Sequence, residues 1–133
     1  MTQQEFELKV KEYLAANEAL SKANNNYVTL QSTHPERNNQ YPNLEEAALF
    51  EKNYKGHIAK EEAAETNVNW LKNNRRSIEC AIIAAIPMKN TWIKAGEWAV
   101  AYRFNAWGSG YNEIEVVKWN NDLGKWSDKT DYP

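Results

Sequence analysis

The sequence predicts an α+β protein: an N-terminal antiparallel α-hairpin with a long second helix, followed by a small aromatic-rich antiparallel β-meander of three or four strands. Three observations lead to this prediction. Apolar residues recur at helical spacing over most of the first 90 residues, a polar stretch containing prolines interrupts them, and the last third alternates apolar and polar residues between glycine-containing turns. Five of the six tryptophans lie in that last third: Trp92, Trp98, Trp107, Trp119 and Trp126.

The chain has 133 residues, the length of one domain, and we expect residues 1–133 to form a single domain. The apolar fraction of 42% and the charged fraction of 26% are ordinary for a globular protein with its own core. The sequence predicts four segments: a first helix over residues 1–31, a connector over 32–42, a second helix over 43–86 and the β-meander over 91–133.

Charge and hydropathy narrow the classes of partner. The net charge is −2 and is spread evenly, so the sequence predicts no basic surface for duplex nucleic acid. The longest apolar run, Ala81–Ile86, is far shorter than the ~20 residues of a membrane span, and the first residues do not resemble a signal peptide. Cys80 is the only cysteine, which excludes an internal disulfide. We therefore expect a cytoplasmic protein that does not enter the membrane.

The first helix begins with a capping box, because Thr2 and Glu5 are spaced to bond each other's backbone. Its heptad pattern leaves two interpretations open. Either the helix continues as a coiled coil with polar residues that select register and oligomeric state, or it ends after Leu20 and the asparagines that follow form a loop. The heptad places Phe6, Tyr13, Leu20 and Tyr27 at d, and Val10, Asn17, Asn24 and Gln31 at a.

The second helix follows the connector and begins at a second capping box, Asn43–Glu46. Gly56 and the Asn73–Asn74 pair are the places where the sequence permits a bend or break. Because this helix presents more apolar surface than a short helix and a small sheet can cover, we expect a homo-oligomer, at least a dimer. The helical stripe comprises Ala47, Phe50, Tyr54, His57, Glu61, Ala64, Val68, Leu71, Arg75, Ile78, Ile82 and Ala85.

The end of the second helix, Cys80–Ile86, is apolar on every face. A segment of this kind is expected to be fully buried, and the simplest arrangement packs it against the aromatic sheet. Cys80 is then a small core residue, because the sequence places no cation or base near it that would make the thiol reactive.

The sequence predicts a β-hairpin around the three-residue loop Gly108–Gly110. If Trp107 pairs with Tyr111, apolar residues face one another on one side of the sheet, with Phe104 opposite Ile114 and Tyr102 opposite Val116. On the other face, Arg103 lies opposite Glu115, Asn105 opposite Glu113 and Ala99 opposite Trp119. A second turn near residues 121–124 returns the chain through Trp126. A three-residue loop would put Trp126 on the face of Trp98, and a four-residue loop would put it beside Trp119.

The face of the hairpin turned away from the core is the first candidate binding site. Flat aromatic rings beside an arginine and carboxylates could stack a base or hold a peptide, and Arg103 could bind a phosphate. The alternative is a solvated sheet face with an ion pair between strands. The candidate residues are Arg103, Asn105, Trp107, Tyr111, Glu113, Glu115 and Trp119.

Arg75 and Arg76 form the second candidate, a basic pair that could bind phosphate groups, although charged residues on long helices are more often solvated surface. We predict no catalytic residues, cofactor or metal site. Asn105 and Arg103 would satisfy Glu113 and Glu115 structurally. The helical spacing of His57 and Glu61 suits a metal but is not accompanied by a further ligand motif.

Three hypotheses for function follow. The first is a non-enzymatic oligomeric binding protein that acts by stoichiometric association, as an inhibitor or adaptor docking on another protein. The second is a protein that sequesters a nucleotide-like anion with tryptophan and arginine at a subunit junction. A small enzyme is the third and least favoured. Small size, abundant asparagine and many aromatic residues suggest an accessory protein of a phage or mobile element.

Overall fold

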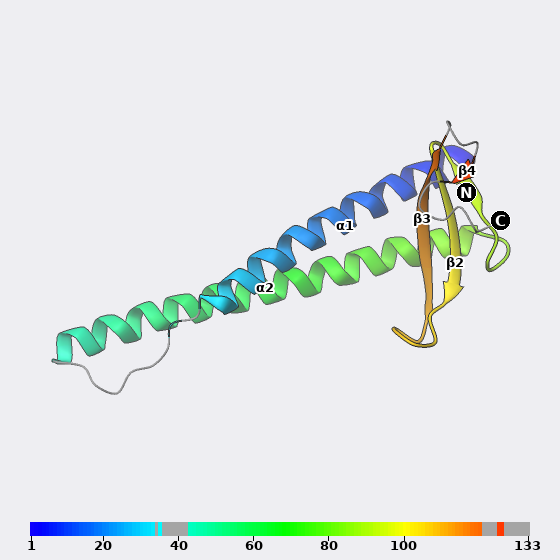
Figure 1. Cartoon of the computed structure of the whole chain (residues 1–133). Helices are drawn as coiled ribbons and strands as arrows, with labels where there is room; N and C mark the ends of the chain where they lie inside the picture. Colours follow the sequence, from blue (N-terminus) through cyan, green and yellow to red (C-terminus); the bar gives the residue numbers. More distant parts are fainter. Residues whose placement is uncertain (34, 36–42, 121–124, 127–133) are drawn as a thin grey trace. The chain divides into compact units, whose positions relative to one another are not determined.

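The structure is a computed structural model that describes residues 1–33, 35, 43–120 and 125–126, with side chains described as far as Lys118. It confirms the predicted α+β fold (Figure 1). Two helices precede an antiparallel sheet of strand order β1-β2-β3-β4. The elements are α1 (Gln3–Ser32), α2 (Leu44–Ala85), β1 (Ile93–Ala95), β2 (Trp98–Phe104), β3 (Asn112–Asn120) and β4 (Lys125–Trp126).

The chain forms two compact units whose boundaries fall inside the two helices. The first, which we call the α/β unit, consists of Met1–Ala16 and Asn74–Pro133. The second, the helical unit, is Asn17–Asn73. In the α/β unit the start of α1 packs with the end of α2, and in the helical unit Leu20 of α1 packs near Val68 of α2. The helices are therefore antiparallel in both units, as the sequence predicts.

Both predicted helix starts are confirmed by their hydrogen bonds. The Glu5 amide donates to the Thr2 hydroxyl at 3.1 Å, and that hydroxyl donates to the Glu5 carboxylate at 3.1 Å. The Glu46 amide donates to the Asn43 side-chain oxygen at 2.9 Å. These bonds satisfy amides that have no partner inside a helix, and so they fix where each helix begins.

Helix α1 continues without interruption to Ser32, so the interpretation that it ends after Leu20 is wrong. The predicted heptad holds at its d positions, where Phe6, Tyr13 and Leu20 are buried and Tyr27 is half-buried, but not at the a positions Asn24 and Gln31, which are exposed. Ala23 is buried where the heptad placed Asn24, and Asn24 itself is exposed. Burial at this turn therefore falls on the small apolar Ala23 and not on the polar Asn24, because a polar side chain is costly to bury without a partner.

Helix α2 is one continuous helix of 42 residues across Gly56 and the Asn73–Asn74 pair. Every position of its predicted stripe is buried or half-buried, from Ala47 to Ala85. Helical periodicity predicted this face correctly because burial selects apolar residues on one side of a helix.

The core of the α/β unit lies between the two helices and one face of the sheet. Its buried members are Phe6, Val10, Tyr13, Ile82, Ile86, Ala95, Val100 and Ile114. The expectation that Cys80–Ile86 is buried throughout is wrong, because Cys80 and Ala84 are exposed while Ile82 is 0% exposed. Only the face of α2 that meets α1 and the sheet is covered, and Cys80 and Ala84 lie on the opposite face.

The start of α1 also holds the β1–β2 turn. The Gly96 amide donates to the Glu7 carboxylate at 3.0 Å, and the Gln3 side-chain amide donates to the Lys94 carbonyl at 2.8 Å. Gly96 has a φ of +64°, in the left-handed region that favours glycine. These bonds fix the first strand, and through it β2, against α1.

The register of β2 and β3 differs from the predicted one by two residues. Tyr102 lies opposite Ile114 and Arg103 opposite Glu113, so Gly108–Gly110 is part of a longer connection between Phe104 and Asn112. A shift of two residues keeps every side chain on its predicted face, because the side-chain period of a strand is two. The backbone register also pairs Trp119 with Trp126, which corresponds to the four-residue second turn.

Candidate binding pocket on the β2–β3 hairpin

A cavity of about 320 Å³ opens at the end of the sheet where β2 leads into the hairpin connection. It brings together five of the predicted candidate residues: Arg103, Asn105, Trp107, Glu113 and Glu115. Phe104, Ala106 and Ile114 complete its lining. The pocket thus combines aromatic and apolar walls with a small number of charged and amide groups, which is the usual composition of a ligand site.

Glycine shapes the connection that forms this pocket. The Asn105 amide donates to the Tyr111 carbonyl at 3.1 Å, and the Gly110 amide donates to the Asn105 carbonyl at 2.8 Å. Gly110 has a φ of +76°. A Cβ atom on Gly108 would lie 2.5 Å from the Asn105 side-chain nitrogen, so glycine is required there for Asn105 to take up its position.

Two hydrogen-bonded pairs line the pocket. The Arg103 guanidinium donates to the Glu115 carboxylate at 2.5 Å, and the Asn105 side chain donates to the Glu113 carboxylate at 3.1 Å. Both contacts were predicted from the sequence, but as residues directly opposite each other. In the observed register Arg103 and Glu115 are diagonal neighbours, which long side chains can still bridge.

Glu113 is held in its charged form. Hydrogen bonds from Ser109 and Asn105 lower the pKa of this carboxyl group, and the charges of Arg75 and Arg76 lower it further against the opposing effect of burial. The pocket lining contains one further acidic side chain, Glu115, and one guanidinium group, that of Arg103.

Trp107 lies in the hairpin connection with its side chain entirely in solvent, at 101% relative exposure. The neighbouring Phe104 is 51% exposed, so its expected place on the core face of the sheet is only partly realised. Toward the other end of the hairpin, Ala99, Ala101 and Val117 are buried. The accessible part of the predicted binding face is therefore the end that contains Trp107.

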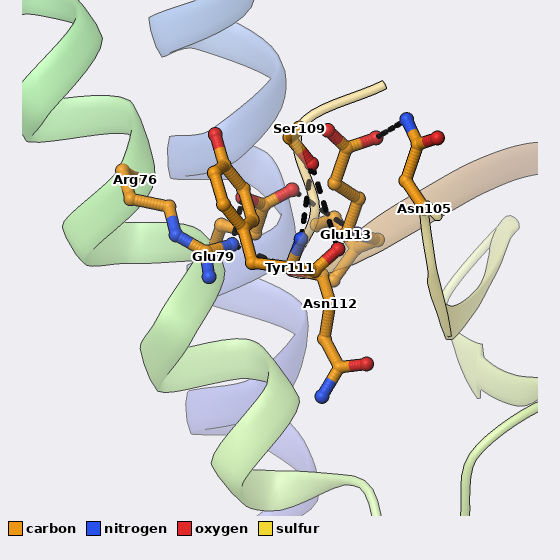
Figure 2. Close-up of polar contacts among 8 residues, drawn as sticks. Arg76, Glu79, Asn105, Ser109, Tyr111, Asn112 and Glu113 are labelled. Atoms are coloured by element: carbon orange, nitrogen blue, oxygen red, sulfur yellow. Dashed lines mark hydrogen bonds and ion pairs between the residues drawn. The ribbon is translucent and has the colours of Figure 1, made fainter. Parts of the chain in front are cut away.

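Arg76 and Tyr111 lie outside the pocket and belong to a contact between α2 and β3, which we call the Arg76–Glu79 clamp (Figure 2). The Arg76 guanidinium donates to the Glu79 carboxylate at 2.5 Å and to the Asn112 carbonyl at 2.6 Å. It also lies 3.8 Å from the centre of the Tyr111 ring. The second carboxylate oxygen of Glu79 accepts from the Ile114 amide at 3.1 Å.

The sequence-based reasoning missed Glu79, which is only 6% exposed. Its signal was available, because an acidic residue three positions after Arg76 in an otherwise apolar helix end has the spacing of an ion pair. Burial of a carboxylate requires such a partner. The clamp gives Arg76 structural contacts within the α/β unit, and phosphate binding by Arg76 stays a prediction.

The remaining predicted site residues are placed as follows. Arg75 is half-buried and does not line the pocket, although its charge acts on Glu113. The side chain of Trp119 lies outside the described part of the chain. His57 and Glu61 contact each other, with 3.3 Å between the His57 Nε2 and the Glu61 carboxylate, and that Nε2 donates to the Leu30 carbonyl at 2.7 Å. This contact connects α2 to the end of α1 inside the helical unit.

The described residues contain neither a metal-binding cluster nor a membrane-spanning helix. They contain no group of three or more histidine, cysteine, aspartate or glutamate residues arranged to hold a metal ion. None of their helices has both the length and the apolar character needed to cross a membrane. Comparison of the chain with protein-family models, with curated proteins and with solved structures finds no match.

Proposed function

We propose that this protein is a non-enzymatic binding protein that acts in the cytoplasm by associating stoichiometrically with another protein, as an inhibitor or an adaptor does. The β2–β3 hairpin is the proposed docking element. The observation that carries the proposal is Trp107, a large aromatic side chain that is fully exposed beside a pocket. An accessory protein of a phage or mobile element would act in this way.

Tryptophan in this position supports docking for an energetic reason. Its side chain contributes no burial to the fold, yet burying a tryptophan in an interface removes a large apolar area from water. Tryptophan, tyrosine and arginine are also the residues most enriched among those that dominate binding energies. The strands hold the hairpin, so little conformational entropy would be lost when a partner covers it.

The alternative is sequestration of a nucleotide-like anion, and the pocket of a single chain supports it less well. Its lining holds two carboxylates and one guanidinium, and that guanidinium is bonded to Glu115. An anion would need further positive charge from a second protomer. A small enzyme remains the third hypothesis, and no feature of the pocket favours it over docking.

Trp107 provides the test of docking. We expect a photo-reactive amino acid at position 107 to cross-link one partner in extracts of the cells that produce the protein, because that side chain projects into solvent. A photo-reactive residue at position 8 is the matched control, since Leu8 is 58% exposed but lies on α1, outside the hairpin. The partner, identified by mass spectrometry and purified, should bind one-to-one, and Trp107→Ala should weaken binding by about 30-fold or more. Equal cross-linking from both positions, or unchanged affinity, would contradict the proposal.

We also propose self-association through the helical unit. Four of its large apolar side chains are exposed: Val28 at 59%, Leu44 at 88%, Leu49 at 58% and Trp70 at 62%. Exposed apolar residues in this number on a small helical unit favour burial against a second protomer.

Leu49→Glu tests self-association, because a charge at a buried interface position opposes association. We expect sedimentation velocity to show an oligomer for the unchanged protein and a shift toward monomer for Leu49→Glu. The matched control is Leu8→Glu, because Leu8 has the same 58% exposure but lies in the α/β unit. A monomeric unchanged protein, or equal effects of the two substitutions, would argue against this interface.

A further inference from the structure

We infer that the hairpin pocket takes an arginine side chain of the partner protein, with its guanidinium between the Trp107 indole and the Glu113 carboxylate. The inference rests on the proposed docking function and names the chemistry of the group that enters the pocket. Three features of the pocket lead to it: its charge, the way Glu113 is held, and the aromatic surface beside it.

The charge of the pocket lining favours a cationic ligand over an anionic one. Of the two carboxylates in the lining, Glu115 has the Arg103 guanidinium as its partner at 2.5 Å. The hydrogen-bond partners of Glu113 are Asn105 and Ser109, which are both neutral. The negative charge of Glu113 therefore remains in the pocket, where the surrounding protein screens it less than bulk water would.

Arg75 and Arg76 reduce this negative potential without cancelling it. Neither residue lines the pocket, and Arg76 is bonded to the carboxylate of Glu79. Their charges act on Glu113 less strongly than the hydrogen bonds from Ser109 and Asn105 do. A cation inside the pocket would meet Glu113 directly.

The aromatic surface favours arginine over lysine. A planar guanidinium can stack on an indole and can donate two parallel hydrogen bonds to a carboxylate, whereas an ammonium group does neither as well. The neighbouring Phe104 and Ile114 can cover the methylene groups of an arginine side chain. The cavity of about 320 Å³ is at the lower end of the ~300–1,000 Å³ range of ligand pockets, which suits one side chain.

The test uses N-acetyl-arginine methylamide as the probe, titrated into the full-length protein and followed by amide and indole NMR shifts. We expect saturable shifts at the Trp107 indole and at the amides of Asn105 and Glu113, with affinity that falls as salt is added. The citrulline analogue is the matched probe, because it has nearly the same shape and no charge. It should bind at least about tenfold more weakly. The glutamate analogue should not bind.

Two matched variants test whether the arginine probe binds at Glu113. Glu113→Gln should weaken binding of the arginine probe by about tenfold, whereas Glu97→Gln should leave it unchanged, because Glu97 lies outside the pocket in the β1–β2 turn. The dispersion of the NMR spectrum shows whether each variant is folded. If Glu113→Gln does not fold, the comparison of arginine with citrulline on the unchanged protein still decides the question.

Equal binding of arginine and citrulline, or arginine-induced shifts that do not involve Trp107, would overturn the inference. A partner captured through Trp107 together with no arginine binding would leave docking intact and reject arginine as the occupant. Arginine binding without any partner captured through Trp107 would reject docking and leave a guanidinium-binding pocket. The same protein with no added probe shows whether an arginine of a second copy fills the pocket. Concentration-dependent shifts at the Trp107 indole in that sample would overturn the assignment to a partner protein.

Discussion

We expect Glu79→Ala to lower the free energy of unfolding by about 3 kcal/mol, near the lower end of the range for breaking a buried ion pair. Glu79 is 6% exposed and joins two elements, α2 and β3, because it accepts from Arg76 on its own helix and from the Ile114 amide in β3. Alanine would leave the Arg76 guanidinium and the Ile114 amide without this acceptor. Urea unfolding followed by circular dichroism and tryptophan fluorescence measures the loss.

Glu12→Ala is the matched control for Glu79→Ala. Lys9 and Glu12 have the same i, i+3 spacing as Arg76 and Glu79, but their side chains are 38% and 42% exposed. An exposed pair of this kind contributes roughly 0–1 kcal/mol. Equal losses for the two substitutions would show that the Arg76–Glu79 clamp does not connect α2 to β3 in solution.

Ile82→Ala should lower the free energy of unfolding by about 3 kcal/mol, within the range for large-to-small substitutions in a packed core. Ile82 is 0% exposed and packs in the cluster that joins α1, α2 and the sheet. The loss combines the transfer free energy of the removed carbons with the cavity left behind, because its neighbours belong to separate elements and cannot close fully around alanine.

Cys80→Ser, two residues earlier on α2, is the control for Ile82→Ala. It shows whether any substitution at this end of the helix lowers the free energy of unfolding, or only one in the core. Cys80 is exposed, so we expect a change within about 0.5 kcal/mol. A thiol-reactive dye should also label Cys80 in the folded protein at a rate close to that in urea. A loss as large as that of Ile82→Ala, or a thiol protected from the dye, would mean that the helix end is buried on all sides.

Local rules were enough to predict most of the two helices. Thr2 and Asn43 are caps because their side chains can reach amides three residues along the chain, which no distant contact has to arrange. The stripe of α2 was also predictable, since one-sided burial leaves a period of 3.6 in the sequence. Apolar composition alone predicted burial of every residue in Cys80–Ile86, and this prediction is wrong. Single apolar residues on a surface are common, and their exposure depends on which face meets another element.

In the hairpin, the rules of cross-strand pairing predicted the face of each side chain but not the length of the loop. Alternation along the strands predicted which residues share a face, and this held because the register error was an even number of residues. The loop length depended on the bonds between Asn105, Gly110 and Tyr111. Those bonds close a longer connection than the three residues Gly108–Gly110 suggested.

The fold class, the helix starts, the packed face of α2 and the pairs Arg103–Glu115 and Asn105–Glu113 could all be predicted from the sequence. Each follows from neighbours in the chain or from a periodicity that burial imposes. Tertiary packing was needed to bring Arg76 to the Asn112 carbonyl and Glu79 to the Ile114 amide, and to leave Trp107 in solvent beside the pocket. These roles depend on which residues of α2 and of the hairpin are brought together. Such contacts join positions more than 30 residues apart, and no local pattern in the sequence records them.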